Sequence, residues 1–170
     1  ERLVVLGDGK LGLLIALGLK TLVPGLLLVG KHADKLAIAQ EQGVRTRRIS
    51  ATEELPALVR ELGAFDVVVE ATGKEDGIAH ALNLVRPEGT LVCKTTSRNP
   101  SQLDLAKLVV DEITLVGSRC GDMDLALEYL RHGWVDVLPL IETTYAFAEF
   151  QAAFDHARRP GAMKVLLQGA

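Results

Sequence analysis

Three glycines with the spacing Gly-x-Gly-x-x-Gly stand near the amino end of the chain, between an apolar run and a helical pattern. The run Leu3–Leu6 is short, apolar and ended by Gly7, so it predicts a buried strand. The residues that follow Gly9 and Gly12 predict a helix over 10–22. Glycines at a strand-to-helix turn let backbone N–H groups and the helix N-terminus approach a pyrophosphate. We therefore expect a dinucleotide-binding loop made of Gly7, Asp8, Gly9, Lys10, Leu11 and Gly12.

Strand and helix patterns alternate through the first 133 residues. The predicted strands are 3–6, 26–29, 44–49, 65–69, 90–93 and 113–116, and the predicted helices are 10–22, 34–42, one ending before Gly63, 75–85, 103–109 and 122–131. Such alternation favours a parallel sheet with helices on both faces. Arginines at 45, 47 and 48 place the third strand near the edge. The predicted fold is therefore α/β, a Rossmann doubly wound six-stranded parallel sheet of order 3-2-1-4-5-6, with a ligand crevice beside strands 1 and 4.

The alternation stops at Trp134. A strand-like stretch over 137–141 is interrupted by Pro139, and a helix over 147–157 and a strand over 163–167 follow. We expect a dinucleotide-binding domain over 1–133 and a C-terminal strand-helix-strand extension over 134–170 that packs on a domain outside this chain. The first residue is Glu1 rather than Met, so the chain is expected to be part of a longer polypeptide.

Composition excludes several functions. The net charge of −3 supplies no basic field for nucleic acid or anionic lipid, and no apolar run is long enough to span a membrane. Cys93 and Cys120 are read as small, buried, reduced side chains, because nothing in the sequence indicates secretion. We therefore expect a cytoplasmic protein with neither nucleic acid nor membrane as a partner.

The end of the second strand bears on the choice of cofactor. Dinucleotides without a 2′-phosphate are usually held there by an Asp or Glu, whereas this sequence has Gly30, Lys31 and His32. Asp34 lies further on, where an acid at a helix N-terminus is the plain explanation. A small residue followed by two cationic or donor groups suits the 2′-phosphate, so NADP is favoured over NAD. The alternative that Lys31 and His32 are solvated loop residues stays open.

Other candidate contacts follow the fourth, fifth and sixth strands, where ligands bind in open α/β sheets. They are Ala71, Thr72, Gly73, Thr95, Gly117 and Ser118. Each is equally well explained as a turn or a helix cap. Glu70 is expected to be a hydrogen-bonded rim residue rather than a general base, and His80, His132 and His156 surface or capping residues rather than metal ligands.

Several of these segments together resemble the medium-chain dehydrogenase/reductase family of zinc-type alcohol and polyol dehydrogenases. They are 4–12, 66–73, 86–92, 113–118 and 163–167, and the resemblance covers essentially the whole chain. It implies an NAD(P)-binding half that binds a nicotinamide dinucleotide, with Lys164 reaching the pyrophosphate. The zinc and most contacts to a small alcohol or polyol are implied to lie in a GroES-like domain that this chain lacks.

The resemblance also implies a homo-oligomer formed through the sixth strand and the 137–141 stretch. Without its catalytic half, the fragment is expected to be inactive. The alternative function is a non-catalytic nucleotide-sensing Rossmann module that regulates a partner.

Overall fold

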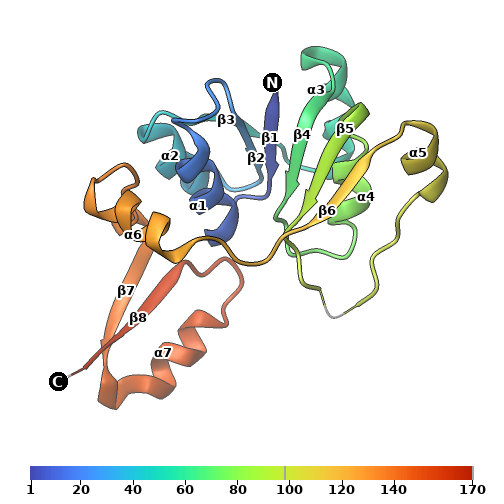
Figure 1. Cartoon of the computed structure of the whole chain (residues 1–170). Helices are drawn as coiled ribbons and strands as arrows, with labels where there is room; N and C mark the ends of the chain where they lie inside the picture. Colours follow the sequence, from blue (N-terminus) through green and yellow to red (C-terminus); the bar gives the residue numbers. More distant parts are fainter. Residues whose placement is uncertain (98, 170) are drawn as a thin grey trace.

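The computed structural model describes residues 1–97 and 99–169, and it contains a large parallel sheet and a small second one (Figure 1). The large sheet has the order β3-β2-β1-β4-β5-β6, which confirms the predicted order. Its strands are β1 (Leu3–Leu6), β2 (Leu27–Gly30), β3 (Arg45–Arg48), β4 (Phe65–Glu70), β5 (Val85–Cys93) and β6 (Thr114–Gly117). The helices that cover it are α1 (Lys10–Leu19), α2 (Ala33–Glu41), α3 (Leu55–Leu62), α4 (Gly77–Leu82), α5 (Leu105–Val110) and α6 (Met123–Arg131), and the single turn η1 (Thr52–Glu54) precedes α3.

The central strand β1 is apolar throughout because it is buried on both faces. Val5 lies opposite Leu28 of β2 and Val69 of β4 in parallel register. Two packed layers result. Leu55 and Leu82, from α3 and α4, belong to the core on one face of the sheet. Helices α1 and α2 pack on the other face.

Several predicted helices are longer than the observed ones, among them α1 and α4. Helix α1 ends at Leu19 rather than at residue 22. Helix α4 covers Gly77–Leu82 instead of 75–85, because Val85 already pairs with Phe65 at the start of β5. The register between β4 and β5 then shifts, and Glu88 takes a φ of 60° in the irregular segment.

The C-terminal residues form a unit of their own below the carboxyl ends of the large sheet (Figure 1). Strands β7 (Ile141–Ala146) and β8 (Lys164–Gln168) pair in parallel, and α7 (Phe150–Ala157) connects them after the turn η3 (Phe147–Glu149). The prediction of a strand over 137–141 is wrong. Pro139 lies in the single turn η2 (Leu138–Leu140), and the strand begins only at Ile141. The boundary between residues 133 and 134 stays a prediction.

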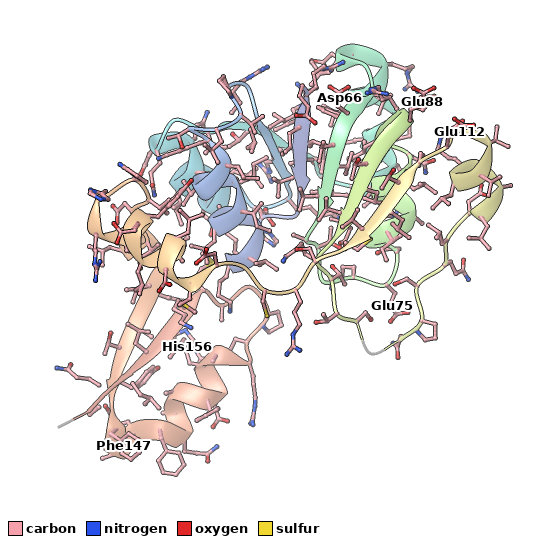
Figure 2. All side chains as sticks on the ribbon, in the orientation of Figure 1. Asp66, Glu75, Glu88, Glu112, Phe147 and His156 are labelled. Atoms are coloured by element: carbon pink, nitrogen blue, oxygen red, sulfur yellow. The ribbon has the colours of Figure 1, made fainter. Side chains whose placement is uncertain are left out.

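The two ends of the sheet carry different groups. Figure 2 places Asp66, Glu88 and Glu112 at the end opposite the C-terminal unit, which contains His156. Phe147 lies at the far tip of that unit and is 67% exposed.

Within the described residues, no helix is both long and apolar enough to cross a membrane.

Candidate dinucleotide-binding cleft

A cleft of about 580 Å³ opens at the carboxyl ends of β1 and β2. Seven of the residues predicted from the sequence line it: Gly7, Asp8, Gly9, Gly30, Lys31, His32 and Thr72. Among the lining residues that the sequence reasoning missed are Lys35, Lys74, Asp76, His80, Pro160 and Gly161. The cleft therefore lies at the predicted crevice, and a loop of the C-terminal unit forms part of its wall.

The glycine loop has the backbone geometry that its spacing predicts. Gly7 has a φ of +120°, which only glycine adopts readily, and its N–H donates to Val29 O at 2.9 Å. A Cβ at Gly12 would overlap the carbonyl oxygen of Gly7, so helix and loop pack as closely as backbone allows. A Cβ at Gly9 would meet no atom within 4 Å, so the loop at Gly9 faces open space. Gly7 and Gly12 thus allow the close backbone packing of the loop, and the lack of a side chain at Gly9 leaves the outer surface of the loop open.

The N-terminus of α1 at this loop has no side-chain cap. Gly9 is the N-cap residue, and no acidic residue lies in the first turn. The first N–H groups of a helix have no partner within the helix, and the helix dipole adds partial positive charge there. A bound phosphate would supply the missing acceptors.

Asp8 occupies the place that a side chain at position 30 would need. A Cβ at Gly30 would overlap both Cβ and the carboxylate of Asp8. Asp8 Oδ2 accepts from the N–H groups of Lys31 at 2.7 Å and His32 at 2.6 Å. A carboxylate is therefore present at the end of β2, although it comes from the glycine loop and not from the strand. The sequence reasoning missed it, because contact across 22 residues is not visible in a linear pattern.

Lys35 is a largely buried residue in the wall of this cleft. Its side chain lies on the packed face of α2 beside Leu36, and the residue is only 8% exposed. Within the described residues its ammonium has no hydrogen bond or ion pair, and its Nζ lies 4.0 Å from the place of a Cβ on Gly161. An ammonium in a cleft wall without a protein partner is available to an anionic or hydroxyl-bearing ligand. A lysine at a buried position of the helical pattern is the signal that would have identified it in the sequence.

Glu70 organises the rim after β4. It is fully buried, and its Oε1 accepts from Thr72 N at 2.8 Å, Thr72 Oγ1 at 2.6 Å and Thr95 Oγ1 at 2.8 Å. Thr95 Oγ1 in turn accepts from the N–H of Gly73 at 2.9 Å. These contacts agree with the expectation of a hydrogen-bonded rim residue. Burial and the charge of Glu70 raise the pKa of the Cys93 thiol, which favours its protonated form.

The other predicted contacts lie outside the cleft walls. They are Lys10, Leu11, Gly12, Ala71, Gly73, Thr95, Gly117, Ser118 and Lys164. The ammonium of Lys10 donates to Ala162 O at 3.1 Å, so it ties the glycine loop to the C-terminal unit. Ser118 Oγ accepts from Lys94 Nζ at 3.1 Å, and Lys164 is exposed in β8 opposite Ile141. Direct roles of these residues in binding stay predictions.

His156, expected to be a surface or capping residue, lies in the last turn of α7. Its side chain is 14% exposed and lies between Tyr145 Oη and Glu142 Oε1, each at 2.9 Å. That histidine and the N–H of Met163 lower the pKa of Glu142. Cys120 was expected to be buried and is exposed.

Among the residues that the structure describes, no three His, Cys, Asp or Glu side chains form a group that could hold a metal ion. This part of the chain therefore offers no ligand set for zinc.

Known proteins with similar sequences and structures are dehydrogenases. Residues 11–143 match the family model described as zinc-binding dehydrogenase. D-arabitol-phosphate dehydrogenase of Enterococcus avium is 25% identical over 99% of this chain and 50% of its own length. An alcohol dehydrogenase from Escherichia coli CFT073 complexed with NADH superposes with a TM-score of 0.86 at 22% identity, covering 99% of this chain and 52% of that one. TarJ of S. aureus in complex with NADPH gives 0.82 at 21% identity, covering 99% and 55%.

The two solved structures support the fold, and the family model covers most of the chain. The chain spans about half the length of the relatives it matches. Those relatives are polyol and alcohol dehydrogenases, which agrees with the resemblance noted in the sequence. This chain belongs to the zinc-binding dehydrogenase family.

Proposed function

We propose that this chain is the cofactor-binding domain of an NADP-dependent dehydrogenase that transfers hydride between the nicotinamide and an alcohol or polyol carbon. The observation that carries the proposal is the cleft itself. It combines an uncapped helix N-terminus, a glycine loop open at Gly9 and a lysine in its wall whose ammonium has no protein partner within the described residues. These are groups that suit an extended polyanionic ligand.

The residues at the ends of β1, β2 and β4 would each hold a different part of a dinucleotide. The N–H groups at the start of α1 would hold the pyrophosphate. Lys35 and the turn after β2 would hold the adenosine ribose, since they line the same cleft. Thr72, fixed by Glu70, would face the dinucleotide from the β4 side. The bound dinucleotide would supply hydride transfer, and the chain's own residues bind and orient it.

NADP is proposed over NAD because basic side chains surround the end of β2. Lys31, Lys35 and the imidazole of His32 line the cleft there, and Arg48 Nε donates to Lys31 O at 3.3 Å. Asp8 opposes a 2′-phosphate, but two backbone N–H groups and the ring of His32 already engage its carboxylate.

The zinc and most of the substrate pocket are proposed to lie in a part of the parent protein outside this chain. The proposal rests on the family and on the half-length coverage of the relatives. A cytoplasmic location stays a prediction.

The proposal is tested in two steps. Isothermal calorimetry on the chain should show binding of NADP that is tighter than binding of NAD. The chain should give no change in absorbance at the reduced nicotinamide band with sorbitol, xylitol or arabitol, whereas the full-length parent should. Turnover by the chain itself, or tighter binding of NAD, would contradict the corresponding part of the proposal.

We also propose that the parent is a homo-oligomer that uses the free edge of β6. Leu115 and Val116 on this strand are 43% and 39% exposed, and its outer edge has no partner in the described residues. Residues 138–140 form the turn η2, so the 137–141 stretch does not offer a strand for this contact. Light scattering on the full-length protein should give a dimer or larger, and a Val116→Lys variant should shift it toward the monomer.

A further inference from the structure

His32 and Asp8 form a coupled pair at the adenosine end of the cleft. His32 Nδ1 lies 3.1 Å from both carboxylate oxygens of Asp8. The Asp8 side chain is 9% exposed and that of His32 is 53% exposed. The carboxylate of Asp8 is thus largely buried, whereas the ring of His32 is accessible from the cleft that it lines.

The contact with Asp8 determines what the other ring nitrogen can do. An ionised carboxylate only accepts hydrogen bonds, so Nδ1 must carry a proton to bond with it. In the neutral ring, Nε2 is then a hydrogen-bond acceptor, which suits a ribose hydroxyl. In the charged ring, Nε2 is a donor, which suits a phosphate. Nε2 has no hydrogen-bond partner among the described residues, so it is available for either ligand.

The charges around the pair favour a change of state on binding. Besides Asp8 on the glycine loop, the groups that surround His32 are Lys31 beside it, Asp34 and Lys35 on α2, Arg48 on β3, and Lys74, Asp76 and His80 across the cleft. Four of these are permanent cations and three are carboxylates, so their opposite charges largely offset one another around the ring. A bound 2′-phosphate adds two negative charges and favours the charged ring.

We propose that His32 takes up a proton when NADP binds and not when NAD binds, so that cofactor choice is linked to pH through the Asp8–His32 pair. This inference rests on the proposed function. It identifies His32 as a specificity-determining residue and Asp8 as the residue that positions its ring. The NADP-to-NAD affinity ratio should then rise as the pH falls.

The wild-type chain provides the primary test. Binding of NADP and of NAD is measured by calorimetry at about pH 8 in Tris and in HEPES, whose ionisation enthalpies differ. At that pH a histidine is ordinarily neutral and a phosphate monoester is already dianionic. We expect an uptake of about one proton per NADP, an affinity for NADP that falls by about tenfold per pH unit, and no uptake with NAD. Binding of NADP with equal heats in both buffers overturns the inference.

Three histidine variants identify the group that takes up the proton. His32→Gln should bind NADP without proton uptake, since glutamine does not titrate. His80→Gln should keep the uptake, although His80 also lines the cleft. His132→Gln, which alters the C-cap of α6, should behave as wild type. Uptake that survives in His32→Gln, or that disappears in His80→Gln, contradicts the inference.

Failure of the proposed function gives a different result. In that case neither NADP nor NAD produces binding heat, and the inference fails with the function. If both cofactors bind but no proton is taken up, only the inference fails.

Discussion

Replacing Gly30 by alanine should destabilise the domain although it adds a single methyl group. The new Cβ would overlap the side chain of Asp8, including its Cβ, so a rotation of the carboxylate cannot relieve the contact. Asp8 would have to leave the N–H groups of Lys31 and His32. A hydrogen bond to a charged group contributes about 1.5 to 3 kcal/mol, and solvation of the displaced groups recovers part of that loss. We therefore expect Gly30→Ala to lower the free energy of unfolding by about 2 to 4 kcal/mol.

A double-mutant cycle isolates the Asp8–Gly30 contact. Asp8→Gly removes the same two hydrogen bonds together with the Cβ that a methyl group at position 30 would overlap, and should lower the free energy of unfolding by about 2 to 3 kcal/mol. In the Asp8→Gly and Gly30→Ala double variant the new methyl group fills the vacated space. The double variant should therefore be about as stable as Asp8→Gly, which corresponds to a coupling energy of about 2 kcal/mol or more.

Urea denaturation followed by circular dichroism measures all four proteins. For a domain of this size, a loss of 2 to 4 kcal/mol corresponds to a decrease in Tm of about 5 to 15 °C. Gly18→Ala serves as the matched control, because a Cβ at Gly18 meets no atom within 4 Å. It should be neutral or stabilising, since alanine favours a helix. A Gly30→Ala variant within about 0.5 kcal/mol of wild type, or strictly additive effects in the cycle, would refute the assigned packing of Asp8 against Gly30.

Three further perturbations have defined outcomes. Lys35→Met should weaken dinucleotide binding in calorimetry by about tenfold or more. It should not lower the free energy of unfolding, because the ammonium has no partner within the described residues to lose. Unchanged affinity would exclude Lys35 from the site. Glu70→Ala should lower the free energy of unfolding in urea by about 2 to 4 kcal/mol, since three donors lose one acceptor; a neutral effect would contradict its role in the rim. The N–H of Arg2 and the side chain of Arg86 lower the pKa of Asp66, so its contribution is present above the unfolded-state pKa and is lost as the pH falls through the folded-state pKa. Acid titration of the unfolding free energy should accordingly show a shallower decline in Asp66→Asn than in wild type, and equal slopes would count against this ion pair.

The fold was predictable because its signals are local. Alternating apolar runs and helical patterns, with glycine at the turns, gave the strand order that the structure confirms. The errors occur where tertiary context decides. The 137–141 stretch has the apolar character of a strand, but Pro139 lies in the single turn η2 and the strand starts at Ile141.

The site was predictable only in part, for the same reason. The glycine loop and the turn after β2 are contiguous segments, and both line the cleft. The side chain of Asp8, in contrast, lies where a Cβ of residue 30 would be, which only a glycine at that position permits. Gly161 lines the cleft from the C-terminal unit. Contacts between residues so far apart in the chain depend on the fold, so no periodicity or spacing could indicate them.

A Gly9→Ala variant tests the central claim most directly, namely that the open face of the glycine loop binds the pyrophosphate. Gly9 has a φ of −72°, which alanine adopts without strain, and its added Cβ would meet no protein atom within 4 Å. The variant should therefore unfold in urea like wild type while its methyl group occupies the path of the bound phosphates. Calorimetry should show a loss of NADP and NAD affinity of at least tenfold at unchanged stability. Wild-type affinity for both dinucleotides in a folded Gly9→Ala protein would contradict the assignment of this loop.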